Sequence, residues 1–143
     1  MACCRVSVVV PVYGAPDELD SCLASLRRNT PPGTDVLVID DASPDLRTRE
    51  ILQGWKDQAI EGWRLIANES NRGFVATANR GFRMTEGDVI LLNSDTEVTP
   101  GWLQRLQHCL KSDRRIATAT PWTNNGEIAS IPDFCAANPV PPD

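Results

Sequence analysis

The sequence predicts an α/β fold in which helices flank a mainly parallel, open β-sheet. Short runs of aliphatic and β-branched residues recur at residues 6–12, 36–39, 63–67 and 89–92, and each run is typical of a buried strand. Between these runs the apolar residues follow helical spacing. Strands that alternate with helices form right-handed βαβ units, so the strands should lie parallel in one sheet.

Length and composition limit the possible functions. The chain of 143 residues suggests one domain with a core of its own. Its net charge of -5 argues against a nucleic acid or an anionic membrane as partner. The five cysteines lack a CxxC spacing and are expected to be reduced thiols, with Cys22 in the core. We find no signal peptide and no transmembrane segment, and we therefore expect a cytoplasmic protein.

The first strand and the first helix follow from residues 6–29. Pro11 has no N–H to donate, so the pairing of the strand should fade there. Pro16 suits the first position of a helix over residues 16–29, and Pro31 follows the end of that helix. The apolar face of this helix comprises Leu19, Cys22, Leu23 and Leu26.

The next strand, residues 36–39, leads into a second helix. Ser43 before Pro44 is the pattern of an N-cap followed by a first helical residue. Residues 63–67 predict a third strand, which Arg64 interrupts. The apolar residues of the second helix are Leu46, Ile51, Leu52 and Trp55.

A third helix is expected over residues 73–85, with Gly87 as its left-handed cap. The strand at residues 89–92 has four consecutive apolar residues, which predicts burial on both faces. The expected apolar face of the helix is Val75, Ala78 and Phe82, and Asn79 falls on the same face.

Small polar and acidic residues follow the strand at residues 89–92. In an extended backbone Asn93, Asp95 and Glu97 would point to one side. Oxygen ligands at the end of a buried strand could hold a divalent cation. The alternative is a loop that caps the next helix.

The fourth helix should begin at Thr99 and Pro100, which repeat the pattern of an N-cap before proline. Residues 116–120 predict a fifth strand. We expect residues 1–122 to form one α/β domain and residues 123–143 to form an irregular, proline-rich tail.

Polar segments follow all four of the first strands. In a parallel sheet the carboxyl ends of the strands meet along one rim, and ligands bind in the crevice there. We therefore expect the polar segments to line one site. They are residues 11–13, 40–41, 68–73 and 93–97.

Carboxylates dominate this predicted rim, and carboxylates bind ribose hydroxyls, nucleobase N–H groups and divalent metals. A metal between Asp95 and a diphosphate would allow an acidic site to hold an anionic substrate. Arg72 could add a positive charge near the phosphates, although a solvated loop arginine explains it equally well.

Three other α/β classes fit the residues poorly. The turn after the first strand lacks the GxGxxG pattern of dinucleotide-binding domains. The GxxxxGK pattern of nucleotide-hydrolysing P-loops is absent. A receiver domain would carry its acidic pair after the first strand, whereas here the pair follows the second.

Four motifs occur in register along residues 5–110. They are VSVVVPVYGAPDELDSCLASL, VLVIDDASPD, NRGFVATANRGF and VILLNSDTEVTPGWL. Together they resemble the inverting family 2 glycosyltransferases, which have the GT-A fold. The NSDTEV form is closest to members that transfer rhamnose and similar sugars in bacterial polysaccharide synthesis.

The resemblance implies a nucleotide-sugar site at the matching positions. Asp40 would read the base, and Asp41 would support the turn or the ribose. The residues that would line the base pocket are Pro11, Val12 and Tyr13. The residues that would shape the floor near the ribose and diphosphate are Asn71, Arg72, Gly73 and Asn79. The DxD-like motif would be Asn93, Ser94 and Asp95.

The resemblance also implies a divalent metal, Mg²⁺ or Mn²⁺, with Asp95 as its ligand. The departure from the family pattern is Asn93 in place of the first Asp of the motif. An amide can bond a ribose hydroxyl but brings no charge, which leaves the metal affinity and the nucleotide preference open. Glu97 could compensate, and a solvated loop carboxylate is the alternative.

In this family an Asp in the second half of the domain acts as general base on the acceptor hydroxyl. We expect that base beyond Asp143, assign no catalytic residue, and interpret the chain as the donor-binding half of a transferase. The expected partners are a nucleotide-diphospho-sugar donor and a saccharide or lipid-linked acceptor.

The alternative function is a degenerate module that binds a nucleotide sugar without transferring it, and Asn93 favours it. In either case a truncated domain should leave a sheet edge or apolar surface uncovered, and such surfaces self-associate.

Overall fold

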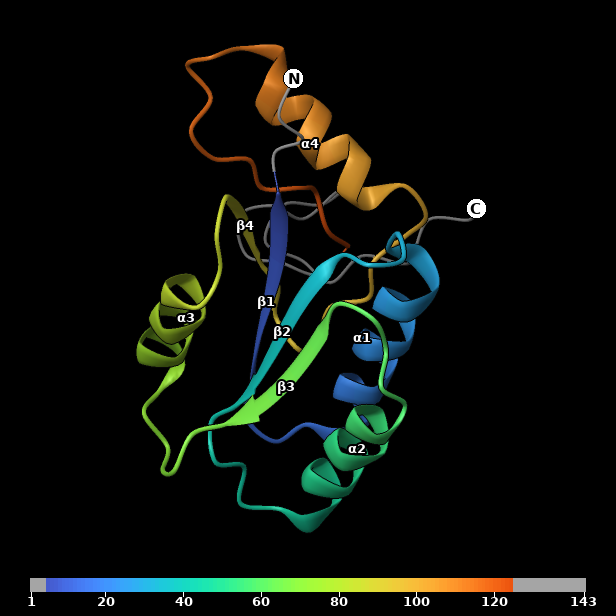
Figure 1. The fold of residues 1–143 in the computed structure, drawn as a ribbon, viewed down its shortest axis with the longest axis vertical. Coiled ribbons are helices and arrows are strands. Elements are labelled where there is room, and N and C mark those ends of the chain that lie inside the picture. Colours follow the sequence, from blue (N-terminus) through green and yellow to red (C-terminus); the bar gives the residue numbers. More distant parts are fainter. Residues whose placement is uncertain (1–4, 125–143) are drawn as a thin grey trace. The chain divides into compact units, whose positions relative to one another are not determined.

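The computed structural model describes residues 5–124, in which strands and helices alternate along the chain (Figure 1). The strands are β1 (Val6–Val12), β2 (Asp35–Asp40), β3 (Trp63–Ala67) and β4 (Asp88–Leu91). The helices are α1 (Pro16–Asn29), α2 (Leu46–Asp57), α3 (Phe74–Arg83) and α4 (Trp102–Ser112). The chain divides into two compact units, one ending at Pro100 and the other beginning at Gly101, so the sheet belongs to the first unit.

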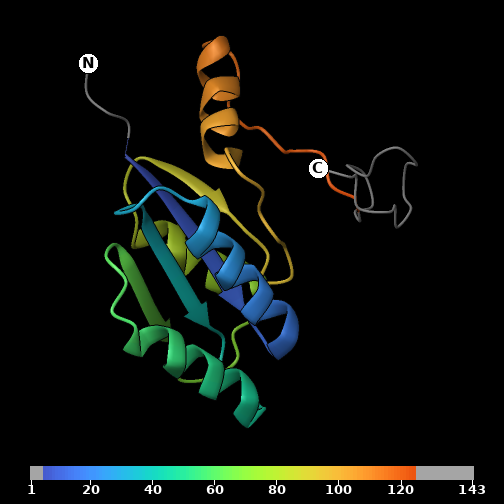
Figure 2. The same ribbon diagram turned by 90° about the vertical axis from the view of Figure 1, so that its right-hand side faces the viewer.

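The sheet is open and wholly parallel, with strand order β3-β2-β1-β4. Helices α1 and α2 lie on one face of the sheet, and α3 lies on the other (Figure 1 and Figure 2). The predicted fold class is therefore confirmed.

The pairing of β1 with β2 continues through Pro11 to Val12, whereas its pairing with β4 reaches only Val9. The prediction that Pro11 weakens pairing is thus wrong for the β2 side.

The core lies between the two central strands and the helices that cover them. The side chains of Val8, Val9 and Val10 in β1, and of residues 36–39 in β2, are fully buried. The predicted apolar face of α1 is confirmed, because all four of its residues are fully buried. They are Leu19, Cys22, Leu23 and Leu26.

Helix α2 begins later than the sequence predicts. Its N-cap is Asp45, whose carboxylate accepts a hydrogen bond from the Thr48 backbone N–H at 2.7 Å, and not Ser43. Leu46 is 73% exposed, so its assignment to the apolar face is wrong. Trp55 stacks on Trp63 of β3, with ring centroids 5.7 Å apart, and joins α2 to the sheet.

Helix α3 packs on the sheet through a different face from the predicted one. Its buried residues are Thr77, Ala78 and Gly81. Of the predicted face only Ala78 is buried, because Val75 and Phe82 are 71% and 42% exposed. Asn79 is exposed as well, so the prediction of a buried amide there is wrong.

Two glycines near the end of α3 have different reasons to be glycine. A Cβ built on Gly81 would lie only 2.3 Å from Cγ1 of Val9, so only glycine allows this close approach of α3 to β1. Gly87 does not cap the helix, because the C-cap of α3 is Met84. Its φ is +82°, and a Cβ there would lie 2.2 Å from the carbonyl oxygen of Arg5.

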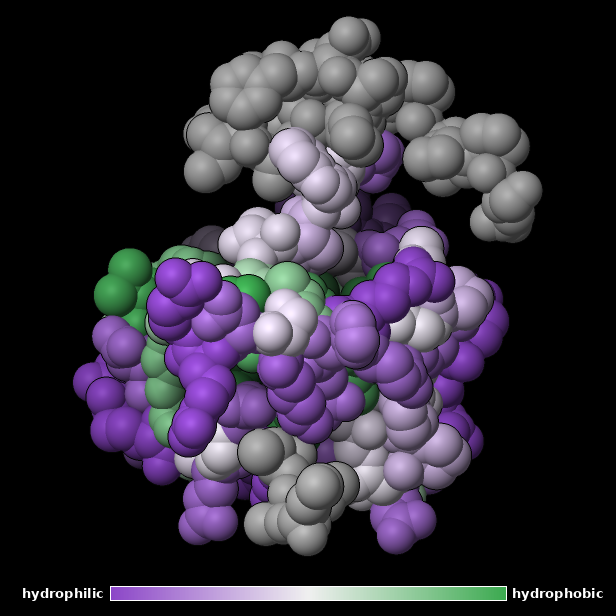
Figure 3. Space-filling model, turned by 90° about the horizontal axis from the view of Figure 1, so that it is seen from above, coloured by the Kyte–Doolittle hydropathy of each residue, from purple (hydrophilic) through white to green (hydrophobic). Residues whose placement is uncertain are grey.

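Strand β4 is an edge strand within the described sheet and is not buried on both faces as predicted. Val89 and Ile90 are half-buried, and Leu91 is 39% exposed. Four other exposed apolar side chains of the first unit lie on or just after α3, and Figure 3 shows apolar residues on that side of the molecule. They are Phe74, Val75, Phe82 and Met84.

In the second unit, α4 follows Gly101, which is its N-cap in the left-handed region, rather than Thr99. Residues 116–120 form no strand in the described part of the chain, so the fifth strand is a wrong prediction. The predicted tail, residues 123–143, lies almost wholly outside the described residues. None of the described helices has the length and apolar character needed to cross a bilayer.

Candidate functional site

The carboxyl ends of β1, β2 and β3 lie level with one another. Val12 pairs with Asp40, and Asp40 pairs with Ala67. The ladder continues for one step beyond the strands, because Asp41 N donates to the Val12 oxygen and Asn68 N donates to the Asp40 oxygen, both at 2.8 Å. Three of the four predicted polar segments are therefore brought together at one edge of the sheet.

Asp40 ties the loop after β1 to the loop after β2. Its Oδ1 accepts hydrogen bonds from the Ser43 backbone N–H at 2.9 Å and from the Ser43 hydroxyl at 2.6 Å. Ser43 Oγ in turn accepts from the Gly14 N–H at 2.9 Å. Asp40 and Ser43 are both buried, whereas Tyr13 next to this junction is 55% exposed. The junction therefore fixes the backbone around Tyr13 and leaves its phenol ring accessible.

Two non-glycine residues beside this junction have left-handed backbone conformations. Ala15, before α1, has a φ of 52°, and Ala42, next to Ser43, has a φ of 56°. Such conformations cost an L-residue about 1 kcal/mol and persist where the surroundings impose them. The tight turns at this edge are thus set by the contacts of Asp40 and Ser43 rather than by local preference.

Asp41 anchors the loop that follows β3. Its Oδ1 accepts from Asn68 Nδ2 at 2.6 Å and from the Arg72 N–H at 2.9 Å, and its Oδ2 accepts from the Gly73 N–H at 2.8 Å. The carboxylate is 3% exposed. It therefore holds the start of α3 against the end of β2, a structural role within the predicted site.

The pKa of Asp41 reflects two opposing causes. Burial by itself would raise the pKa of this carboxyl, but hydrogen bonds from Asn68, Arg72, Thr77 and Gly73 outweigh burial, and the pKa is lowered. The charged form is therefore the one that the folded chain stabilises. The side chain of Arg72 is exposed and forms no ion pair with the described residues, so its guanidinium is accessible at this edge.

The fourth predicted segment, after β4, lies along α1. Cys22 Sγ donates to the Asn93 oxygen at 3.7 Å, Ser25 Oγ accepts from the Val98 N–H at 2.9 Å, and Asn29 Nδ2 donates to the Val98 oxygen at 2.7 Å. These three residues lie on one face of α1 at helical spacing. The segment between Leu92 and Val98 is therefore fastened at both ends.

Residues 93–96 form a turn and not the extended stretch that the sequence predicts, because Thr96 N donates to the Asn93 oxygen at 3.2 Å. Asn93 and Asp95 are exposed, and Ser94 is half-buried. No group of three acidic, histidine or cysteine side chains suited to a metal occurs among residues 5–124. Asp95 and Glu97 are both exposed in this segment, and neither belongs to such a group, so other oxygens must be added to complete a metal site at Asp95.

The attachment of this turn to α1 makes a prediction about Cys22. Burial raises the pKa of the Cys22 thiol to about 12, and the charges of Asp95 and Glu97 act in the same direction. At pH 8 its thiolate fraction is then about one in ten thousand. We expect iodoacetamide to alkylate the exposed Cys109 and to leave Cys22 unmodified, as read from peptide masses. Equal labelling of the two thiols in the folded protein would contradict the packing of Asn93 on α1.

The structure does not bring Asn79 into these contacts, since its side chain is exposed and forms no hydrogen bond with the described residues. Two of its neighbours on α3 do join these contacts, because Thr77 and Arg80 each form a hydrogen bond with Asn68. Sequence reasoning missed these two residues and the role of Ser43. A threonine on the buried face of a helix that starts at the predicted rim was the available signal.

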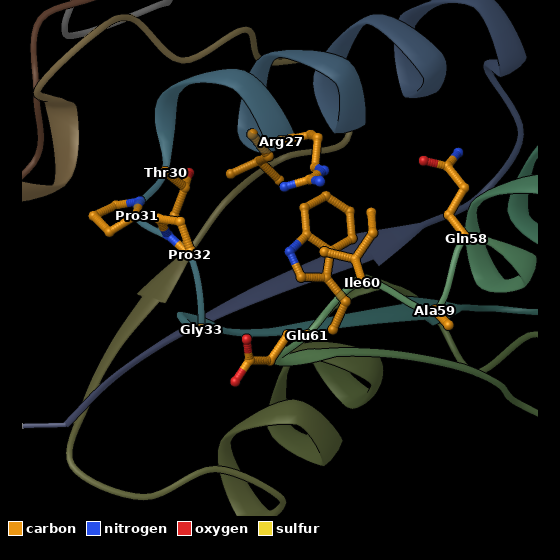
Figure 4. Close-up of a pocket in the computed structure, with 11 residues that line it drawn as sticks. Arg27, Thr30, Pro31, Pro32, Gly33, Gln58, Ala59, Ile60 and Glu61 are labelled. Carbon is orange, nitrogen blue, oxygen red and sulfur yellow. The ribbon is translucent and has the colours of Figure 1, made fainter.

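A hollow of about 410 Å³ lies at the other end of the strands (Figure 4). Its lining comes from the turn between α1 and β2 (Thr30, Pro31, Pro32 and Gly33) and from residues 58–61 before β3. These residues precede β2 and β3, whereas the predicted site follows them. The hollow is therefore separate from the candidate site.

Comparison with known proteins supports the fold. Three solved structures that align with the chain are a mannosyltransferase from Pyrobaculum calidifontis, TarS from S. aureus, and GalNAc-T7. Their TM-scores are 0.67, 0.64 and 0.66, at sequence identities of 23%, 24% and 22%. The alignments cover 76%, 77% and 78% of this chain. The fold is therefore that of the GT-A glycosyltransferases, as predicted.

The chain spans only 33%, 32% and 21% of the lengths of these three proteins. No match was found among curated protein sequences. The sequence profile of glycosyl transferase family 2, in contrast, matches residues 7–133, which is most of the chain and all of the sheet except Val6. The chain therefore belongs to glycosyl transferase family 2.

Proposed function

We propose that this chain forms the donor-binding part of a metal-dependent, inverting glycosyltransferase that uses a nucleotide-diphospho-sugar. The observation that carries the proposal is the junction of Val12, Asp40 and Asp41 with residues 68–73 at the carboxyl ends of adjacent parallel strands. Ligands of open α/β sheets bind at this edge. The sugar transferred is of the rhamnosyl or hexosyl type.

In this proposal the nucleoside lies against the loops after β1 and β2. The accessible ring of Tyr13 contacts the base, whereas Pro11 and Val12 are buried and support the loop that carries Tyr13. One oxygen of Asp40 is committed to Ser43, and its Oδ2 forms no hydrogen bond with the described residues, so it is available to accept from a base N–H. Asp41 contributes indirectly, because its contacts hold Gly73 in place.

The diphosphate lies between the loop that carries Arg72 and the turn that carries Asp95. Mg²⁺ and Mn²⁺ sites use one or two carboxylates together with substrate phosphate oxygens, which fits the accessible carboxylate of Asp95. Two of the similar structures are complexes with Mn²⁺, one with GDP-Man and one with UDP and GalNAc. A bound metal would neutralise charge on the departing nucleoside diphosphate. Asn71 and Arg72 complete this side of the site, and Asn93 can bond a ribose hydroxyl.

The acceptor is proposed to be a saccharide or a lipid-linked saccharide, and its hydroxyl attacks the anomeric carbon. We assign no general base among residues 5–124. His108 is exposed on α4 and belongs to the second compact unit. We therefore expect this chain alone to bind nucleotide with little or no transfer.

The test is the metal-dependent affinity for a nucleoside diphosphate. We expect Asp95→Ala to weaken binding of UDP or GDP in the presence of Mn²⁺ by about tenfold or more, because the metal loses its protein ligand. Asp88→Ala is the matched control. It removes an exposed carboxylate at the start of β4, the strand that precedes Asp95, and should leave the nucleotide affinity unchanged. Calorimetric titration with and without Mn²⁺ measures the nucleotide affinity of both variants. Equal affinities of the Asp95→Ala variant and the unaltered chain would contradict the metal site.

A second candidate is a module that binds nucleotide sugars without transferring them. The uncharged Asn93 in the DxD-like turn favours it. This candidate predicts nucleotide binding that is independent of Mn²⁺ and insensitive to Asp95→Ala. Restoring the acidic residue by Asn93→Asp should then leave the affinity unchanged, whereas the metal-dependent reading expects tighter binding in Mn²⁺.

We also propose self-association through the β4 edge and the exposed apolar side chains of α3. Unpaired edge strands and apolar patches are the usual sites of such contacts. Light scattering over a wide concentration range tests it, and a monomer throughout would contradict it.

A further inference from the structure

Arg80 on α3 is a half-buried cation without a carboxylate partner among the described residues. Its Nη1 donates to the Ala67 carbonyl oxygen at 2.9 Å and also to Oδ1 of Asn68. Both acceptors lie at the end of β3. A guanidinium that is partly withdrawn from water normally sits beside an anion. Through Asn68, Arg80 is linked to the carboxylate of Asp41.

The amide of Asn68 lies between this cation and the buried carboxylate of Asp41. Asn68 Oδ1 accepts from Arg80, while Nδ2 donates to Asp41 Oδ1 at 2.6 Å and to Thr77 Oγ1 at 2.9 Å. The orientation of the amide is set by its partners, because a guanidinium only donates and an ionised carboxylate only accepts. Its oxygen thus faces the positive group and its nitrogen the negative group, the arrangement in which charge strengthens both hydrogen bonds.

Asp41 carries this chain of contacts to the loop, through the N–H groups of Arg72 and Gly73. Asn68 and Thr77 are 7% and 0% exposed, so water does not replace the contacts readily. Among residues 5–124 the loop is therefore attached through the buried Asp41, and Asn68 donates to the same carboxylate oxygen as Arg72.

We propose that Asn68 is a positioning residue, which links Arg80 to Asp41 and so fixes the loop of Asn71, Arg72 and Gly73 for the diphosphate of the donor. The assignment of a donor to this loop rests on the proposed function. The placement of the loop by Asn68 does not, so the two can be tested separately.

Asn68→Asp is the sharpest variant because it changes one atom type and little volume. The new carboxylate can still accept from Arg80, but it cannot donate to Asp41 and places a second negative charge beside it. We expect the amide protons of Arg72 and Gly73 to exchange about tenfold faster or more, measured by nuclear magnetic resonance without nucleotide. We also expect the dissociation constant of UDP or GDP with Mn²⁺ to rise about tenfold or more.

Arg80→Gln and Arg80→Lys test the other end of the link. Glutamine removes the charge and should accelerate exchange at Arg72 and Gly73, whereas lysine keeps a charge with N–H donors and should restore part of the protection. Arg64→Gln is the matched control. Arg64 bonds Asp35 and the Met84 oxygen, away from the site, and its loss should leave exchange at Arg72 and Gly73 unchanged.

Protection of Arg72 and Gly73 that is unchanged in Asn68→Asp and in Arg80→Gln would overturn the proposal. So would equal acceleration in Arg64→Gln, since the effect would then be a general loss of stability. If Asn68→Asp does not fold, Arg80→Gln and its lysine counterpart decide the question alone. If the unaltered chain binds neither UDP nor GDP, the proposed function fails, and faster exchange in the variants still supports the positioning role.

Discussion

Replacing Asp41 with alanine is expected to lower the free energy of unfolding by about 3 kcal/mol, the largest effect of any single change at the site. The carboxylate is buried and accepts hydrogen bonds from Asn68, from the N–H groups of Arg72 and Gly73, and from Thr77. Hydrogen bonds to a charged group are worth about 1.5–3 kcal/mol each, and the exposure of the loop reduces the share of the two backbone donors. Asn68 would be left with a buried amide that has lost its charged acceptor.

Urea unfolding measures this loss, and Asp17→Ala provides the comparison. Asp17 pairs with Arg47, but both side chains are mostly exposed, so its removal should change the unfolding free energy by about 0.5 kcal/mol or less. A loss in Asp41→Ala as small as that in Asp17→Ala would mean that the loop does not depend on Asp41.

The pH dependence of the unfolding free energy separates the contribution of the Asp41 charge from that of its side-chain packing. Because the folded chain lowers the pKa of this carboxyl, the stabilisation is complete above the pKa of the unfolded chain, about 3.9, and is lost as the pH falls through the lower folded value. The stability difference between the unaltered chain and Asp41→Ala should therefore be constant near neutral pH and shrink below about pH 4. A difference that grows on acidification would contradict the cause assigned to the shift.

The parts of this fold that sequence predicts well are those that local pattern decides. Helix α1 begins at Pro16 and buries Leu19 and Leu23 as expected, because its proline and its apolar spacing lie within the helix itself. The strands follow for the same reason, since runs such as residues 63–67 have strand propensity whatever their neighbours. The order of polar segments at the carboxyl ends of parallel strands then follows from topology alone.

The parts that sequence mispredicts are those that distant contacts decide. Ser43 has the local pattern of an N-cap, yet its hydroxyl is bonded to Asp40 and to Gly14, which lies 29 residues earlier. The stretch at residues 93–96 forms a turn because its contacts with α1 hold it in place. Residues 116–120 contain several β-branched residues but have no strand partner among the described residues. Positioning residues such as Asn68 depend on three elements at once, which no single segment reveals.

The buried face of α3 is also decided by a distant contact, and this contact predicts the second large change in stability. Spacing selects Val75 and Phe82, but the helix approaches β1 so closely that only small residues fit between them. Gly81→Ala should lower the free energy of unfolding by about 1–3 kcal/mol, because the new methyl group overlaps Val9. This loss would occur even though alanine favours a helix over glycine by about 1 kcal/mol.

Gly54→Ala is the matched control, since Gly54 lies within α2 and nothing is found within 4 Å of a Cβ built on it. That change should stabilise the protein by about 0.5–1 kcal/mol, so the two substitutions are expected to have opposite signs in the same urea experiment. Two changes of the same sign would mean that α3 does not approach β1 as closely as the structure indicates.

A double variant identifies the cause. Val9→Ala alone should cost about 2 kcal/mol for the lost methyl groups, but it also removes the atom that Gly81→Ala would strike. The combined loss should therefore be smaller than the sum of the two single losses by about 1 kcal/mol. Because α3 also carries Thr77 and Arg80, Gly81→Ala should accelerate amide exchange at Gly73 beyond its effect on global stability, and Val9→Ala should reverse that acceleration. Strictly additive losses of unfolding free energy would instead mean that the strain does not arise at Val9. The packing of α3 on β1 would then not control the order of the loop before α3.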